Sequence, residues 1–213
     1  MTLKQQLEDI LERLSSIGYD TRELVFAPPC EFIEVQALEQ VLGFSLPPSF
    51  RETLLTVSGY VEFRWFRPQG VQFPQPFRSN FCGDLHWSIE FTKSFNEAKD
   101  SWVNKVFPNP ADPYDAVWHN KLAFYEVGNG DYLAIDLEPK SYEQIVYLSH
   151  DDGEGHGHVL AENFRELLRR WTPLACPGGE DWQWLPFTNG LSTPIDPHCQ
   201  NAKTWCELLQ IAT

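Results

Sequence analysis

The first third of the chain carries apolar residues at helical spacing. Residues 3–17 place leucines and isoleucines three and four positions apart, and Gly18 follows, which predicts an amphipathic helix. A second helix is predicted at 32–42, where Gly43 occupies the position at which helices commonly end. A third is predicted at 48–58, because proline is tolerated in a first helical turn.

The middle of the chain changes to the alternating pattern of strands. Val61, Phe63 and Trp65 alternate with Glu62, Arg64 and Phe66, which predicts a strand with an apolar face. An Asn-Gly turn separates two strand-like runs and supplies the backbone freedom that a tight hairpin requires. These runs are 122–127 and 132–137, and further strands are predicted at 85–91 and 145–148.

Two further helices and a proline-rich loop complete the predicted domain. Residues 67–84 hold three prolines and are expected to form a surface loop. A helix at 94–106 is expected to bury Phe95, Trp102 and Val106 and to expose Asn96, Glu97, Lys99 and Asp100. The last core helix is predicted at 159–171.

Helices followed by clustered strands and a final helix predict an α+β fold, with a mixed, largely antiparallel sheet flanked by helices. We expect residues 1–172 to form this domain. Residues 173–213 are rich in proline and tryptophan and form a C-terminal extension, which should pack on the domain and end in a short helix at 197–211.

The charge of the chain narrows the possible partners. Sixteen Lys and Arg against thirty Asp and Glu give a formal net charge of −14, which argues against nucleic acid or an anionic membrane as the main ligand. Aromatic residues make up 14% of the chain and are suited to anchoring a protein interface. The N-terminal segment carries acids where a signal peptide would be apolar, so a cytoplasmic location is expected.

The segment 150–158 has the densest candidate chemistry, with three histidines and three carboxylates. Such side chains can bind zinc or manganese, but HExxH spacing is absent, and a polar connection between a strand and a helix is the alternative. The five cysteines form no CxxC pair, and neither a phosphate-binding loop nor a GxSxG motif is present. We therefore expect a protein without catalytic residues, cofactor or metal.

Three segments together resemble the SUKH superfamily, which contains a fungal cell-wall synthesis regulator and many bacterial immunity proteins. The resemblance covers roughly residues 33–171. It rests on Leu38-Glu39, Gly43, Leu46-Pro47 and Gly59 in the opening helices, Gly128-Asn-Gly-Asp131 in the hairpin, and His150-Asp151-Asp152 before the last core helix.

The resemblance implies a non-catalytic role, in bacterial members often the neutralisation of a toxin such as a nuclease. An acidic inhibitor suits the basic groove of such a toxin, so a basic toxin domain is the expected partner. A regulatory or scaffold protein is the first alternative, and a small metal-dependent hydrolase centred on 150–158 is the second. From the expected exposure of turns and loops, the candidate partner-binding residues are the acidic residues Glu62, Asp131, Asp151, Asp152 and Glu154, with Trp65 or Phe66 as an aromatic anchor.

Overall fold

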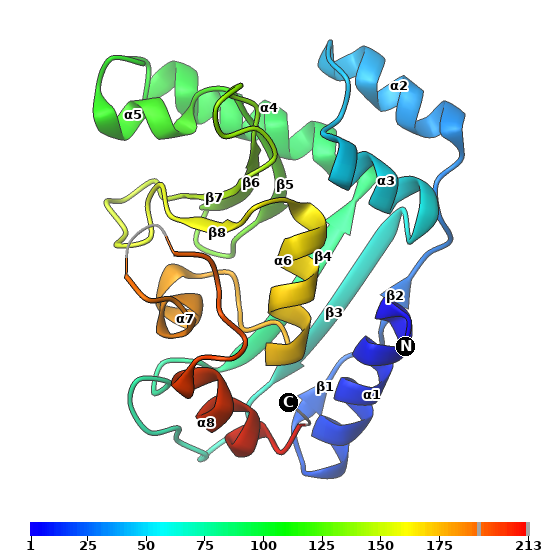
Figure 1. Cartoon of the computed structure of the whole chain (residues 1–213), viewed down its shortest axis with the longest axis vertical. Coiled ribbons are helices and arrows are strands. Elements are labelled where there is room, and N and C mark those ends of the chain that lie inside the picture. Colours follow the sequence, from blue (N-terminus) through cyan, green and yellow to red (C-terminus); the bar gives the residue numbers. More distant parts are fainter. Residues whose placement is uncertain (191–192, 212–213) are drawn as a thin grey trace.

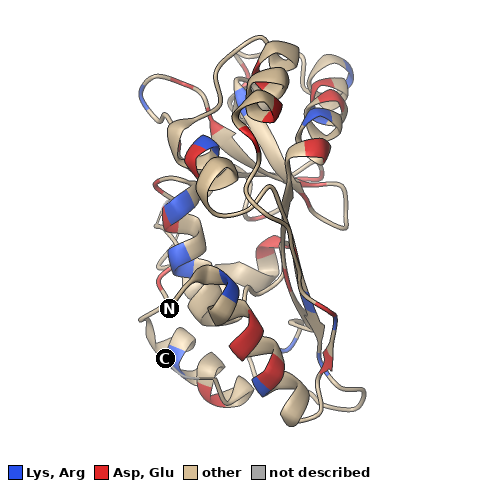
Figure 2. Ribbon diagram, turned by 90° about the vertical axis from the view of Figure 1, so that its right-hand side faces the viewer, with Lys and Arg blue, Asp and Glu red and all other residues tan. Residues whose placement is uncertain are grey.

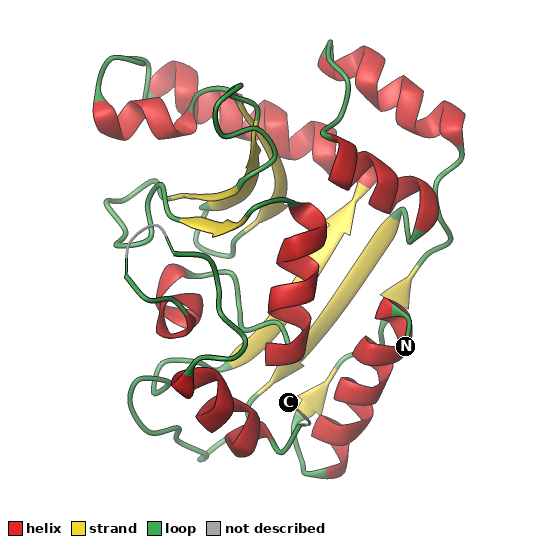
Figure 3. Cartoon of the chain, viewed as in Figure 1, coloured by secondary structure: helices red, strands yellow, loops and turns green. Residues whose placement is uncertain are grey.

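The computed structural model describes residues 1–190 and 193–211, and it has the α+β fold expected from the sequence (Figures 1 and 3). Two four-stranded antiparallel sheets replace the single sheet that we expected. The helices of this part of the chain are α1 (Leu3–Ser16), α2 (Phe32–Leu42), α3 (Pro48–Thr56), α4 (Ile89–Lys105), α5 (Pro113–Trp118), α6 (Phe164–Trp171), α7 (Asp181–Trp184) and α8 (Gln200–Leu209). None of the helices described is both long and apolar enough to cross a membrane.

The first sheet is built around two long strands, β3 (Tyr60–Phe66) and β4 (Cys82–Ser88), which pair along their whole length. The short strands β1 (Asp20–Thr21) and β2 (Val25–Phe26) pair with the other edge of β3. Alternate residues of β3 are fully buried, as the sequence pattern predicted. The side chains between them are only partly buried. Figure 2 shows the long strands from the side, with the helices of the lower half lying against one face of the sheet.

The second sheet has helices on both faces. Its strands follow the order β5 (Lys121–Glu126), β6 (Tyr132–Asp136), β7 (Ile145–Leu148) and β8 (Val159–Ala161). One face joins the main core with α3 and α6, and the other packs on α4 and α5 in a smaller cluster. Every residue of β6 and β7 is buried, as expected for strands covered on two sides.

The boundaries near α4 and α6 differ from those predicted. The strand placed at 85–91 runs from Cys82 to Ser88, and the Ser88 hydroxyl then accepts hydrogen bonds from the first amides of α4. Residues 159–161 form β8 rather than the start of a helix, because they pair with β7. The helix begins only at Phe164, where the side chain of Asn163 caps it.

The buried face of α4 was predicted only in part. Glu97 and Asp100 are exposed and Phe95 and Trp102 pack on the smaller cluster, as expected, but three other positions differ. Asn96 and Lys99 are buried, whereas Val106 is exposed. The Asn96 amide exchanges two hydrogen bonds with the backbone of Ala123, and Lys99 donates to the carbonyl of Lys121. Because β5 is an edge strand, these polar side chains satisfy backbone groups that no neighbouring strand reaches.

Several residues after 172 lie against the inner face of the first sheet. Trp65 Nε1 donates to the carbonyl of Ala175 at 2.8 Å, and the Asp84 amide donates to the carbonyl of Cys176. Trp205 of α8 packs against Phe73 and Phe77, which the loop between β3 and β4 contributes to the core. We expected that loop to lie at the surface, but Phe73 and Phe77 are buried. They are buried because Trp205 of the extension packs on them.

Gly83 is essential to this attachment. A Cβ atom at Gly83 would lie 2.1 Å from Trp65 Nε1 and 2.4 Å from the Ala175 carbonyl oxygen. Both distances are far shorter than a van der Waals contact. Because the oxygen belongs to the backbone and cannot rotate away, any side chain at Gly83 must push the extension away from the sheet.

We expect Gly83→Ala to lower the free energy of unfolding by about 1–3 kcal/mol, through overpacking and disruption of the Trp65 hydrogen bond. Gly128→Ala is the matched control, because a Cβ there meets nothing within 4 Å, and its effect should stay within about 0.5 kcal/mol. Urea denaturation of the two variants checks this. Equal stabilities would show that the extension is not held at Gly83.

Candidate functional site

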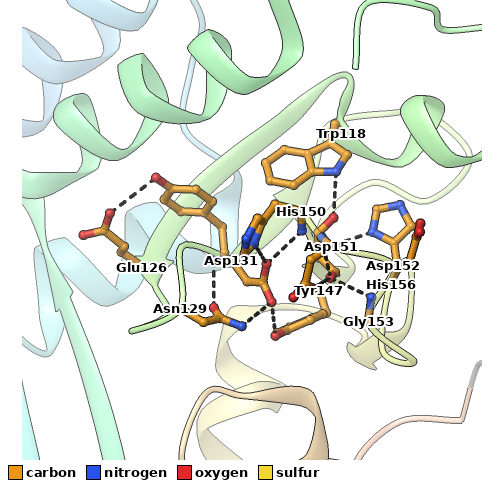
Figure 4. Close-up of polar contacts among 12 residues, drawn as sticks. Trp118, Glu126, Asn129, Asp131, Tyr147, His150, Asp151, Asp152, Gly153 and His156 are labelled. Carbon is orange, nitrogen blue, oxygen red and sulfur yellow. Dashed lines mark hydrogen bonds and ion pairs between the residues drawn. The ribbon is translucent and has the colours of Figure 1, made fainter. Parts of the chain in front are cut away.

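Asp131 is the centre of a buried hydrogen-bond network between the β5–β6 turn and the loop after β7 (Figure 4). One of its carboxylate oxygens accepts from Asn129 Nδ2 at 2.7 Å and from the Tyr147 hydroxyl at 2.5 Å. The other accepts from the amide and from Nδ1 of His150, at 2.8 and 2.6 Å. Only 1% of Asp131 is exposed, so these four bonds replace its hydration.

The loop 149–158 is folded by contacts of its own rather than left flexible by its glycines. The Ser149 hydroxyl accepts from the amide of Gly153 at 2.9 Å and donates to the carboxylate of Asp151. The ring of His156 stacks on Tyr114 of α5, with centroids 3.7 Å apart. This order holds the acidic side chains of the loop on the surface.

The three histidines of this loop have separate partners. His156 Nδ1 accepts from the Ser149 amide and its Nε2 donates to the carbonyl of Tyr114, which defines a neutral ring, and burial lowers its pKa. His158 Nε2 donates to the carbonyl of Thr193, and burial lowers the pKa of His158 as well. His150 is therefore the one histidine of the three that lies beside Asp131.

Within the described residues, one group of side chains has metal-ligand spacing. Ligand atoms of Asp131, His150 and Asp151 lie within 4.8 Å of one another. However, both oxygens of Asp131 already accept two hydrogen bonds each, and His150 Nδ1 is one of the donors. A cation would have to displace these bonds, so the geometry favours a structural role for the pair.

The loop carries an acidic surface that continues into the extension. Asp151, Asp152 and Glu154 are exposed, and the amide of Gly155 donates to Asp181 Oδ2 at 2.9 Å. We use the name acidic surface for five residues, which are Asp151, Asp152, Glu154, Glu180 and Asp181.

The charges of the acidic surface affect one another. The pKa of Glu180 is raised, first by burial and then by the negative charges of Asp131, Asp181 and Asp151. No Lys or Arg occurs in residues 141–164 or 171–202, so neither acidic segment has a basic neighbour within its own stretch of chain. The two segments together create a concentrated negative potential.

An exposed aromatic pair adjoins this surface. Phe81 precedes β4 and Trp182 is part of α7, and their ring centroids are 5.9 Å apart. Phe81 is 45% exposed and Trp182 36% exposed. Large exposed rings next to charge are a frequent composition of protein interfaces.

The remaining candidates lie on the outer face of the first sheet. Glu62 and Phe66 are partly exposed on β3, and the guanidinium of Arg22 lies over the ring of Phe66. On β4, Asp84 binds both Arg64 Nε at 2.5 Å and His86 Nδ1 at 2.8 Å. Burial alone would raise the pKa of Asp84, but the bonds and charges of His86 and Arg64 lower it.

Two of the candidate partner-binding residues are not on the surface. Trp65 is fully buried, as the alternation of β3 requires, and its indole holds the extension. Asp131 is buried because the hairpin turn folds back under the loop 149–158. The expectation that Asp131 is exposed is wrong, whereas the burial of Trp65 agrees with the apolar face predicted from the alternation of residues 61–66.

The sequence profile of the SMI1/KNR4 family (SUKH-1) matches residues 29–170. The chain belongs to this family. The SUKH match agrees with the range inferred from the sequence and runs from just before α2 to the end of α6. No curated protein matches the chain.

The SUKH match places α1 and the extension outside the family region. Asp151, Asp152 and Glu154 therefore come from the SUKH domain, whereas Glu180 and Asp181 come from the segment that follows it. Sequence reasoning missed Glu180, Asp181 and Trp182. The absence of Lys and Arg from residues 171–202 is the signal that could have identified them.

We expect Asp131→Asn to lower the free energy of unfolding by about 2–4 kcal/mol, because an amide replaces one buried acceptor and opposes its donors. Asp152→Asn is the control, since Asp152 is an exposed carboxylate with φ +62°, a conformation that asparagine tolerates. Thermal or urea denaturation of both variants measures this difference in the free energy of unfolding. If Asp131→Asn is as stable as the control, the network does not organise this region.

Proposed function

We propose that this SUKH chain is a non-catalytic protein-binding domain that acts as an immunity protein. In this proposal it binds a basic toxin domain, such as a nuclease, in the cytoplasm and neutralises it through the acidic surface. The partner-binding residues are Asp151, Asp152 and Glu154 of the loop, with Glu180 and Asp181 beside them. Glu62 and Phe66 belong to a second contact region on the outer face.

One observation carries the proposal. Two acidic segments, about thirty residues apart in sequence, meet through the bond between Gly155 and Asp181. Burial is the first cause of the raised pKa of Glu180, and the negative charges of Asp131, Asp181 and Asp151 raise it further, which supports repulsion among these carboxylates. A cation from a partner would relieve this repulsion, so the surface is suited to a basic protein.

The chemistry of the expected toxin agrees with this surface. A nuclease must bind phosphates, and it therefore has a basic groove. An acidic protein that enters the groove blocks the phosphate site, and long-range attraction accelerates its association. The exposed pair Phe81 and Trp182 would supply the apolar contact that charge alone does not provide.

A regulatory or scaffold function is the second candidate, and helix α2 supports it. Phe32, Ile33 and Val41 are 58%, 67% and 59% exposed, so this helix presents apolar side chains to solvent. A partner bound there would associate through apolar contact, which added salt hardly weakens. Salt dependence therefore distinguishes the two candidates.

The direct test is affinity capture with the tagged protein at about 50 and 300 mM salt, followed by a nuclease-inhibition assay with the captured domain. The triple variant D151N/D152N/E154Q should associate with that toxin domain at least about tenfold more slowly at low salt. Asparagine suits position 152, and glutamine keeps the size of Glu154, so the loop should remain folded.

The matched control is E8Q/D9N/E12Q on α1, which also removes three negative charges, but from exposed positions outside the acidic surface. Both variants change the net charge from −14 to −11. If the two triple variants slow association equally, net charge rather than the acidic surface directs binding. Retention of a partner that is insensitive to salt would favour the scaffold function.

A further inference from the structure

A pocket of about 380 Å³ opens on the outer face of the first sheet. Strands β3 and β4 form its floor, α4 forms one wall, and the end of β5 forms another. We call it the outer pocket, and its lining residues are Tyr60, Glu62, Arg64, His86, Phe91, Phe95 and Glu126. It is separate from the acidic surface, which is built on the loop after β7 and on the extension.

Three aromatic rings line one side of the outer pocket. The ring of Phe91 lies 6.1 Å from that of Tyr60 and 5.9 Å from that of Phe95, measured between centroids. Phe91 is 45% exposed, so much of its ring is not covered by the protein. Aromatic faces gathered in this way attract cations through their quadrupoles.

Carboxylates supply the charge of the pocket. Its one guanidinium, Arg64, binds Asp84 beneath the pocket at 2.5 Å and lies 3.9 Å from Glu62. The lining residues Glu62 and Glu126 and the underlying Asp84 carry three negative charges against the one positive charge of Arg64, which leaves an excess of two negative charges. The pKa of Tyr60 is raised, first by its hydrogen bond to Glu62, with Glu90 contributing further negative charge.

The floor of the pocket is held in place. His86 Nδ1 is bonded to Asp84 at 2.8 Å, and the imidazole stacks on Tyr125 with centroids 3.9 Å apart. The hydroxyl of Tyr125 also donates to Asp84. A rigid floor lowers the conformational entropy that the protein loses when a ligand binds.

We propose that the outer pocket receives an arginine side chain of the partner protein. A planar guanidinium can stack on Phe91 or Tyr60 while its N–H groups donate to Glu62 and Glu126. An ammonium group lacks the flat face, and an anion would be repelled by the excess negative charge. This inference rests on the proposed function only for the identity of the protein that carries the arginine.

The test uses N-acetyl-arginine amide as a probe, with the uncharged N-acetyl-citrulline amide and N-acetyl-lysine amide for comparison. Titrations are followed by NMR shifts of residues 60–64, 84–88 and 126. The arginine probe should give saturable shifts with a millimolar dissociation constant, and lysine should bind at least about threefold more weakly. Equal shifts with citrulline would overturn the proposal.

The variants E62Q/E126Q and Phe91→Leu should each weaken arginine binding, the first by about tenfold. The loop variant D151N/D152N/E154Q should leave it within about twofold and serves as the matched control. If the loop variant weakens the probe as much as E62Q/E126Q does, or if no saturation is reached, the pocket is not an arginine site. The far-UV circular dichroism of each variant confirms that it is folded.

The titration contains no toxin, so its outcome is distinct from that of the proposed function. Arginine binding without toxin inhibition would contradict the immunity function but support the outer pocket as an arginine site. Toxin inhibition without arginine binding would contradict the pocket alone.

Discussion

The contact between Trp65, Gly83 and Ala175 is the constraint on which the candidate surface depends. The indole of Trp65 can reach the carbonyl of Ala175 only because position 83 has no side chain. This contact fixes the start of the extension against the inner face of β3 and β4. From there the chain runs into α7, which brings Glu180, Asp181 and Trp182 beside the loop 149–158.

Asp131 provides the second half of the arrangement. It is buried and bonded on both oxygens, so it connects the β5–β6 turn to the loop that carries Asp151, Asp152 and Glu154. Burying a carboxylate costs free energy unless its oxygens accept hydrogen bonds that replace those to water. Because Asp131 keeps these bonds in only one arrangement, it favours a single conformation of the loop. The buried carboxylate of Asp131 thus fixes the conformation of the loop, and with it the positions of the exposed carboxylates.

The β5–β6 hairpin also lies between the two proposed contact regions. Glu126 ends β5 and lines the outer pocket, whereas Asp131, just after the turn, supports the acidic surface. A partner that spans this hairpin would contact both regions. Charge would then direct the approach, and the aromatic rings of the pocket would provide a specific anchor.

Local patterns predicted the fold well wherever short-range rules decide the structure. The alternation of β3, the glycine that ends α2 and the Asn-Gly turn each follow from a few neighbouring residues. The errors come from tertiary contacts. Asn96 is buried because it satisfies the edge of β5, and Phe77 is buried because Trp205 covers it. The same reason explains why only part of the acidic surface was predicted. Asp151, Asp152 and Glu154 are adjacent in sequence, whereas Asp181 lies beside them only because of a tertiary contact with Gly155.

Hydrogen-exchange footprinting of the complex between the chain and the partner domain captured with it tests the central claim most directly. We expect protection in residues 150–155 and 180–183 and on the outer face of β3, at salt concentrations that preserve the complex. Protection confined to α2 and the residues around Phe44, with none in the loop 150–155, would contradict the claim that the acidic surface binds the partner.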